Sequence, residues 1–321
     1  MKNPKVSILI ATYNQEDYIK EAVNSALNQS YENIEVIVSD DCSTDNTFKV
    51  LLDIKDERVK IYRNQKNIGR IANHRKLLYE YATGDFVAFL DGDDFYIYDN
   101  FVKDAVDIFL NYDDVISVLG GYEDLFYTGE RKQFLSTTNL NIIDGIDILF
   151  RRYKVRYAHG SWIFKRNLIE KFEFFSGKVP IGDDLEGWFK SLFFGKVALL
   201  PKAVFTHRIH FDNGVVKVDV EKLLKDLYLY DIIKNFGVSI GYSEKLMSKW
   251  RDYYILKQVE SFVSWAYSLY KRNIYTKEHL EALLYNFTKS LKENYNIKII
   301  PSKRKSITSL QLKAIKVLKN V

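Results

Sequence analysis

Short runs of consecutive apolar residues recur in the first part of the chain. They cover residues 6–13, 34–40, 58–63 and 85–91. Between the first two runs, residues 16–28 repeat small and apolar side chains at the spacing of an amphipathic helix. Apolar runs without alternation are typical of strands buried on both faces, so the pattern predicts a parallel sheet covered by helices.

The pattern becomes mixed after residue 114. We expect, in order, a strand at 115–122, a helix at 145–152, a strand at 161–166, a helix at 183–194 and a strand pair at 196–200 and 203–210. From Val218 onward the long segments are helical in pattern. We therefore predict an α/β domain over residues 1–215, with a mixed, mainly parallel sheet flanked by helices, and an all-helical C-terminal appendage over residues 216–321.

Composition narrows the class of protein. Cys42 is the sole cysteine, which excludes an internal disulfide and a multi-cysteine zinc site. Hydrophobic residues make up 47% and charged residues 28%, the balance of a packed globular protein. Apolar runs stay well short of the roughly 18 residues of a membrane span, and the segment after Met1 does not have the pattern of a signal peptide. We expect a soluble, cytoplasmic protein.

The net charge of +5 is too mild to indicate nucleic-acid binding. Residues 297–321 hold seven Lys and Arg and no acidic residue, so the rest of the chain is slightly acidic. Apolar residues also recur at helical spacing between residues 307 and 321. This basic helix is expected either to pack on preceding helices or to lie on an anionic membrane, which would make the protein peripheral at the inner face of the cell membrane.

Three carboxylates follow the predicted strand at 85–91. Asp91, Asp93 and Asp94 repel one another unless a cation lies between them, and Mg²⁺ or Mn²⁺ with a diphosphate is the simple explanation. The alternative is a solvated loop in which Asp93 or Asp94 caps the next helix. An EF-hand is excluded because the twelfth loop position is Val102 instead of Glu.

Two further loops follow predicted strands. Asp40 and Asp41 precede a helix that we expect to open near residues 43–44, so one of them is expected to cap it and the other to accept hydrogen bonds from a base or ribose. In the third loop, Gly69 permits close backbone approach beside Asn67, and Arg70 can reach phosphate or base.

The segments VSILIATYNQ, VIVSDDCSTDNT, NIG and GDFVAFLDGDD, in this order and spacing, resemble the family 2 glycosyltransferases of the GT-A fold over roughly residues 4–215. The resemblance implies that Asp91 contacts ribose or metal and that Asp93 binds the metal. It implies that Ala11, Thr12, Tyr13 and Asp41 bind the nucleoside. With the third loop, the expected nucleotide-binding set also includes Asn67, Gly69 and Arg70.

IGDDLEGWFK resembles the later acidic motif of that family. Asp184 then corresponds to the general base, Asp183 replaces a Glu, and Trp188 corresponds to the motif's Trp on the acceptor side. A carboxylate there can take the proton of an attacking hydroxyl. The competing interpretation makes Asp183 an N-cap and Asp184 a partner of the helix dipole.

THRIHFDN resembles a further segment of the family. Arg208 is then expected to pair with the diphosphate and His210 to complete the metal shell. His207 stands where Tyr is usual, so its role is open.

Together these features predict an inverting, metal-dependent glycosyltransferase. The expected donor is a UDP-sugar, and the expected acceptor is a hydroxyl of a glycan or lipid-linked glycan. Two alternatives are a phosphohydrolase, whose Asp nucleophile also follows an apolar strand, and a non-catalytic protein that binds sugar nucleotides or glycans. The donor sugar, the linkage and the oligomeric state are left open.

Overall fold

The structure is a computed structural model that describes residues 3–180, 182–209 and 224–271, with residues 276–278, 281, 285 and 289 beyond them. The chain divides into two compact units. The first contains Met1–Gly177 and Asp183–Lys217, and the second contains Lys178–Gly182 and Val218–Val321. His210 and the basic segment 307–321 lie outside the described residues.

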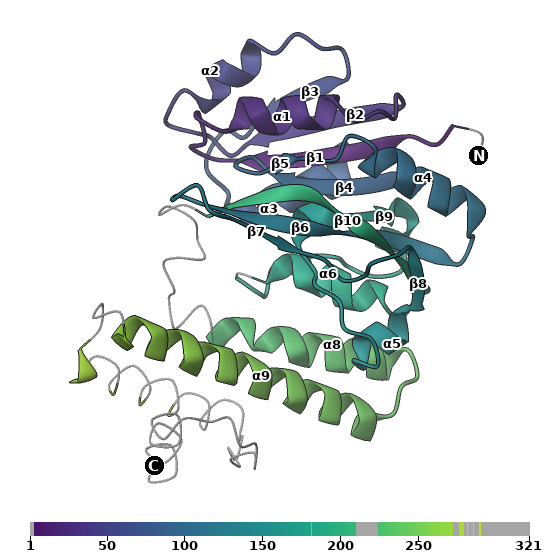
Figure 1. Cartoon of the computed structure of the whole chain (residues 1–321), viewed down its shortest axis with the longest axis vertical. Helices are drawn as coiled ribbons and strands as arrows, with labels where there is room; N and C mark the ends of the chain where they lie inside the picture. The colour runs from purple at the N-terminus through teal and green to yellow at the C-terminus, as the bar shows by residue number, and fades with distance from the viewer. Residues whose placement is uncertain are drawn as a thin grey trace. The chain divides into compact units, whose positions relative to one another are not determined.

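The first unit contains one large sheet with helices on its faces (Figure 1). Its strands are β1 (Val6–Thr12), β2 (Ile34–Asp40), β3 (Val59–Arg63), β4 (Phe86–Asp91), β5 (Phe95–Tyr96), β6 (Val115–Phe126), β7 (Arg131–Phe134), β8 (Asn141–Asp144), β9 (Trp162–Lys165) and β10 (Lys196–Ile209). Its α-helices are α1 (Ile19–Leu27), α2 (Thr47–Leu52), α3 (Arg70–Lys76), α4 (Phe101–Asn111), α5 (Gly145–Leu149) and α6 (Asp183–Ser191). A π-helical turn, η1 (Leu77–Tyr81), continues α3, and the 3₁₀ turns η2 (His159–Ser161) and η3 (Arg166–Glu170) flank β9.

The sheet is mixed, as the sequence predicts. Its order is β3-β2-β1-β4-β9-β6-β10-β5, with β7 beside β6 and β8 beside β10. The strands β3, β2, β1 and β4 are mutually parallel, whereas β9 runs antiparallel to both β4 and β6. The carboxyl ends of β1, β2 and β4 therefore meet at one edge of the sheet, where ligands bind in open α/β sheets.

Successive side chains of the parallel strands point to opposite faces of the sheet. Ile8, Ile10 and Leu90 belong to a buried cluster with residues of α1 and α4. The strand residues between them point to the opposite face, where Phe89 contacts His74 of α3 with ring centroids 5.5 Å apart. Asp91 follows Phe89 by two positions, so strand periodicity places the Asp91 side chain on the α3 face as well.

The structure differs from the sequence pattern at β10. The two predicted strands form one strand, Lys196–Ile209, that passes through Pro201. Its pairing with β6 shifts register between Leu199 and Ala203, so the proline lies at an irregularity where no ladder hydrogen bond is required from it.

Helix α2 also begins later than predicted. Its first residue is Thr47, because residues 43–46 form a turn in which the Asp45 carboxylate accepts a hydrogen bond from the Thr47 amide at 2.9 Å. Neither Asp40 nor Asp41 caps this helix.

A buried carboxylate, Glu35, organises the start of β2, at the opposite end of the parallel strands from their carboxyl edge. It accepts hydrogen bonds from Lys5 and Lys60 at 2.7 Å each, and also from Ser7 and Thr83. Burial alone would raise the pKa of Glu35, but these donors hold it well below its ordinary value.

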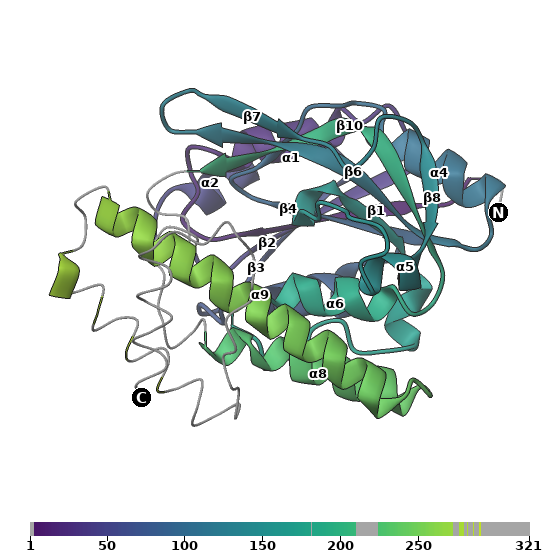
Figure 2. The ribbon, with the colours of Figure 1, turned by 60° about the horizontal axis from the view of Figure 1, so that its bottom comes forward.

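The second unit is mainly helical over residues 224–271. Helices α8 (Tyr228–Ser239) and α9 (Glu244–Lys271) lie side by side in both views (Figures 1 and 2). Tyr230 contacts the rings of Trp250 and Tyr254, and Arg251 of α9 pairs with Asp231 of α8 at 2.8 Å. Among the described residues, no helix combines the length and apolar character that a membrane crossing demands.

Candidate active site

Three loops are joined by backbone hydrogen bonds at the carboxyl edge of the sheet. The Asp41 amide donates to the Thr12 carbonyl at 2.9 Å, and the Gly92 amide donates to the Ala11 carbonyl at 3.2 Å. A Cβ at Gly92 would stand 2.3 Å from Gln15 Oε1 and 2.9 Å from Thr12 Oγ1. Glycine at this position therefore allows the DGDD loop to pack closely against the loop after β1.

Asp40 and Asp41 have separate roles after β2. Asp40 accepts from the Ser43 amide at 3.2 Å and lies 3.2 Å from Arg63 Nε, which makes it a local turn residue. Asp41 reaches the next loop, where Oδ1 accepts from Asn64 Nδ2 and the Ile68 amide, both at 2.9 Å. Its Oδ2 accepts from the Gly69 amide at 2.8 Å. Asp41 thus anchors the loop that the sequence assigns to nucleotide binding.

Gly69 has a positive φ of 89°, a conformation that side-chain-bearing residues rarely adopt. Asn67 Oδ1 accepts from its amide at 3.1 Å, which fixes the turn before α3. Arg70 is the exposed first residue of α3. Across the edge, the Tyr13 side chain is also exposed, whereas Ala11 and Thr12 are buried. The exposed groups are therefore available to a ligand at this edge.

The DGDD segment is not a helix cap, because the short strand β5 follows it. Asp94 is 3% exposed, and its carboxylate accepts from the Arg208 amide at 2.9 Å. Burial, together with the nearby charges of Asp93 and Asp91, raises the pKa of Asp94 well above its ordinary value, against the opposing effect of Arg208. The negative charges of Asp91 and Asp93 therefore act on Asp94 in the same direction as its burial.

Arg208 lies beside this carboxylate group. Its guanidinium donates to the Asp93 carbonyl at 2.7 Å, pairs with Glu21, and lies 4.4 Å from the centroid of the Phe95 ring. His207 points to a different partner, with Nδ1 3.1 Å from Asp124 Oδ1 on β6. His207 and Arg208 are therefore adjacent in sequence but contact different partners.

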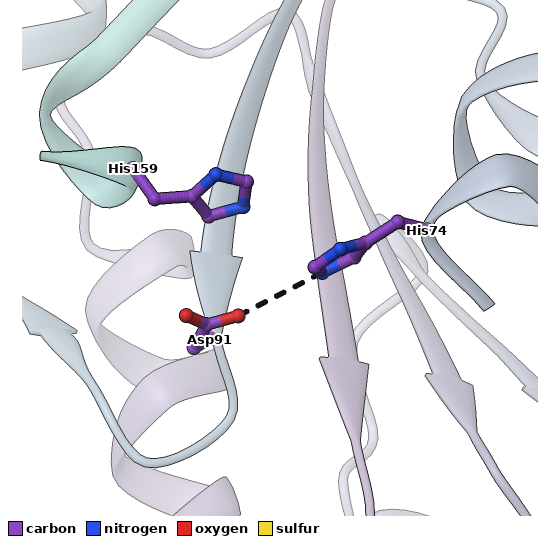
Figure 3. Close-up of side chains that lie close together, drawn as sticks. All are labelled: His74, Asp91 and His159. Carbon is purple, nitrogen blue, oxygen red and sulfur yellow. Dashed lines mark ion pairs between the residues drawn. The ribbon is translucent and has the colours of Figure 1, made fainter. Parts of the chain in front are cut away.

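Two histidines that sequence analysis did not select lie next to Asp91 (Figure 3). His74 is fully buried on α3, and its Nε2 is 3.7 Å from Asp91 Oδ1. His159 begins η2, and its ring centroid is 5.2 Å from that of His74. One ligand atom from each of the three residues lies within 4.8 Å of the others. We call these three residues the His–Asp–His cluster.

The cluster affects the charge of Asp91. Burial alone would raise the pKa of Asp91, but the nearby imidazoles of His74 and His159 and the Arg70 guanidinium hold it well below the ordinary value. These neighbours therefore favour the carboxylate form of Asp91 at the end of β4.

Asp184 faces the same cluster from α6. Its Oδ2 lies 3.7 Å from His159 Nδ1, and its side chain is 17% exposed. Asp183 is the first residue of the helix, as the sequence predicts. His159 therefore stands between the carboxylate that ends β4 and the carboxylate at the start of α6.

Buried contacts hold α6 in place. Trp188 is 2% exposed, stacks on Tyr157 at 4.9 Å and meets Trp162 edge-on, so it packs in the core. Glu186 and Lys190 form a buried ion pair one turn apart, and Lys190 also donates to the Glu173 carbonyl at 2.8 Å. These contacts fix the helix that carries Asp184.

Comparison with known proteins identifies the family. Residues 7–172, just over half of the chain, match the model of glycosyl transferase family 2. The chain therefore belongs to glycosyltransferase family 2, and the sequence-based prediction of family and class is confirmed.

Curated relatives bear glycosyltransferase names. An uncharacterized glycosyltransferase of Rickettsia typhi is 27% identical over 284 residues, which cover 88% of this chain and 84% of that protein. The Escherichia coli UDP-Glc:alpha-D-GlcNAc-diphosphoundecaprenol beta-1,3-glucosyltransferase WfaP is 45% identical over 92 residues, covering 29% of this chain and 36% of that protein. An uncharacterized glycosyltransferase of Rickettsia conorii is 29% identical over 217 residues, 66% of this chain and 35% of that protein. The matches to the Rickettsia conorii protein and to WfaP thus span only 35% and 36% of those proteins.

Solved structures share the fold. S. aureus TarS 1–349 in complex with UDP-GlcNAc has a TM-score of 0.68 and 18% identity, covering 98% of this chain and 89% of that chain. The Pyrobaculum calidifontis mannosyltransferase PcManGT in complex with GDP-Man and Mn²⁺ has a TM-score of 0.55 and 16% identity, covering 99% of this chain and 86% of that chain. The predicted GT-A fold class is confirmed.

Proposed function

We propose that this chain catalyses the inverting transfer of a sugar from a UDP-sugar to a hydroxyl group of a glycan or a lipid-linked glycan. The observation that carries the proposal is that His159 lies close both to Asp91, at the carboxyl end of β4, and to Asp184, at the start of α6. A donor diphosphate held at Asp91 and an acceptor hydroxyl at Asp184 would then lie on either side of the His159 imidazole.

The nucleoside is proposed to bind at the loops that Asp41 joins, in contact with Ala11, Thr12 and Tyr13. A carboxylate has about four acceptor positions, and three hydrogen bonds to Asp41 are seen. The remaining position on Oδ2 suits the imide N–H of uracil. The named donors of WfaP and TarS, UDP-Glc and UDP-GlcNAc, support a UDP-sugar.

The diphosphate is proposed to bind beside Asp91, Asp93, Arg70 and Arg208. Carboxylate oxygens in the DGDD segment fit a hard divalent ion such as Mn²⁺ or Mg²⁺, which would offset the negative charges of Asp91, Asp93 and Asp94. Asp91 and Asp93 would hold the ion, with His210 as the further ligand implied by the family. The ion, when bound, offsets the charge of the departing diphosphate.

The chain's own residues then perform the transfer. Asp184 accepts the proton of the acceptor hydroxyl as that oxygen bonds to the anomeric carbon, and the bond from this carbon to the diphosphate oxygen breaks. Attack from the face opposite the leaving UDP inverts the configuration. Arg208 can exchange its contact with Glu21 for a diphosphate oxygen, because charge-assisted bonds to phosphate are strong.

The acceptor side is proposed to begin at the start of α6, where Asp183 adjoins the base and Trp188 holds the helix from the core. We propose residues 1–215 as the catalytic domain and residues 216–321 as the region that contacts acceptor, oligomer partner or membrane. A lipid-linked acceptor, which the name of WfaP includes, would suit a cytoplasmic enzyme at the inner face of the membrane.

The experiment is a donor screen. UDP-Glc, UDP-GlcNAc and GDP-Man are each incubated with the chain, Mn²⁺ and a panel of glycans and lipid-linked glycans, and release of UDP or GDP is measured. The proposal expects UDP release that requires both Mn²⁺ and an acceptor. Tight UDP binding without turnover on any acceptor would favour the non-catalytic alternative instead.

A further inference from the structure

The proposed transfer uses Asp91 but gives no role to the two imidazoles beside it. His74, Asp91 and His159 come from α3, the end of β4 and η2, three segments that are distant in sequence. Their ligand atoms nevertheless lie within 4.8 Å of one another. Two imidazoles with one carboxylate form a ligand set suited to Zn²⁺, Co²⁺ or Ni²⁺, unlike the all-oxygen sets that suit Mg²⁺.

We propose that the His–Asp–His cluster is a second metal site, selective for borderline divalent transition metals such as Zn²⁺, and that its occupation blocks sugar transfer. The site shares Asp91 with the proposed diphosphate site but is independent of Asp93. The metal site itself stands on the geometry of the three side chains, and only the block of transfer rests on the proposed function.

The three ligand atoms must move closer together to bind one metal ion. Zn²⁺ bonds to imidazole nitrogen and carboxylate oxygen are about 2.0–2.2 Å long, so ligand atoms around one ion are roughly 3–3.5 Å apart. His74 Nε2 and Asp91 Oδ1 are already within 3.7 Å. Figure 3 shows the rings of His74 and His159 on the same side of the Asp91 carboxylate, so side-chain rotations can close the remaining gap.

Asp184 adds an outer contact of the kind that metal sites use. Its Oδ2 is 3.7 Å from Nδ1 of His159, while the other nitrogen of that ring faces the cluster (Figure 3). A histidine that binds metal through one nitrogen commonly donates from the other to a carboxylate, which orients the ring. Asp184 is placed to orient His159 in this way.

Occupation of the site would oppose transfer for two reasons. The ion would take the Asp91 carboxylate away from the donor diphosphate or ribose. It would also draw His159 and Asp184 into a fixed contact, so that Asp184 is less available to the acceptor hydroxyl.

The test measures Zn²⁺ binding by calorimetry and Co²⁺ binding by visible absorption, on the full chain without nucleotide. We expect one Zn²⁺ site whose affinity falls by more than about 100-fold in His159→Gln, since loss of an outer partner alone costs roughly 10- to 100-fold. His74 is fully buried, so His74→Gln is accompanied by a melting curve. His207→Gln, outside the cluster, should leave Zn²⁺ affinity unchanged.

Asp93→Asn separates the two proposed sites. This variant should keep the Zn²⁺ affinity and the Co²⁺ spectrum while losing Mn²⁺-dependent UDP binding. Absence of Zn²⁺ binding, or binding that is equally tight in folded His159→Gln, would overturn the proposed site. If Zn²⁺ binds as expected but no sugar nucleotide is turned over, the metal site stands and the proposed function fails.

Discussion

Nδ1 of His159 lies 3.7 Å from Oδ2 of Asp184, although His159 belongs to η2 and Asp184 to α6. The same imidazole stacks on Phe89 of β4 with ring centroids 4.8 Å apart. His159 therefore connects the strand that ends in the DGDD segment to the helix that begins with the candidate base.

Replacing Asp93 should abolish the metal dependence of UDP binding. Asp93→Asn removes one charge from a carboxylate set expected to hold the cation, while nearly preserving shape. Calorimetric titration of UDP with and without Mn²⁺ measures this. Wild-type protein should bind UDP more tightly with Mn²⁺, and the variant should bind equally in both conditions. A variant that retains the full Mn²⁺ effect would contradict the assignment.

Gly69 should be required for UDP binding beyond its effect on stability. Gly69→Ala forces alanine to a φ of 89°, and strain of this kind costs roughly 1–3 kcal/mol. Gly129, in the turn after β6, has a φ of 83°, and a Cβ at either glycine meets open space. Gly129→Ala is thus a matched control that should lower the melting temperature to a similar degree.

The two glycine variants should differ in ligand binding. UDP affinity should fall in Gly69→Ala, because its amide donates to Asp41, and stay unchanged in Gly129→Ala. Equal UDP affinities in both variants would remove this loop from the nucleotide site.

Glu35 should make folding stability depend on acidic pH. The pKa of Glu35 in the folded protein lies well below its ordinary value of 4.5. The ionised carboxylate therefore contributes fully to the free energy of unfolding above pH 4.5, and this contribution is lost as the pH falls below 4.5. Glu35→Gln should destabilise the protein by about 2 kcal/mol at pH 7, within the range for hydrogen bonds to charged groups.

Denaturant unfolding between pH 3 and pH 7 measures this effect. The stability of Glu35→Gln should fall less steeply than that of wild type as the pH is lowered below 4.5. Glu57→Gln, at an exposed position, should follow the wild-type curve. If the stability of Glu35→Gln fell with pH as steeply as that of wild type, Glu35 would not be the group that causes the acid sensitivity.

Much of the fold could be predicted from the sequence because its signals are local. The apolar runs that became β1, β2 and β4 need no tertiary information, and polar residues after parallel strands must meet at one edge. The continuity of β10 through Pro201 was not predictable in this way, because the partner strand and its register shift decide whether a proline is tolerated there.

The candidate site was predicted only where residues belong to a recognisable motif. Asp41 and Asp91 were selected because they follow predicted strands, and Asp184 because its motif opens a predicted helix. His74 lies inside a helix and His159 in a 3₁₀ turn, and neither has a spacing signal. Strand periodicity could have indicated that Asp91 shares a face with α3, but the approach of η2 depends on packing across the whole sheet.

The central claim is tested most directly by Asp184→Asn in a transfer assay combined with UDP calorimetry. A general base acts in the transition state, so turnover should fall by about 10²-fold or more while UDP affinity stays near the wild-type value. Asp107→Asn, at a position 58% exposed on α4, should leave both unchanged. Wild-type turnover in folded Asp184→Asn, or losses of UDP affinity and turnover in equal proportion, would contradict its role as the base.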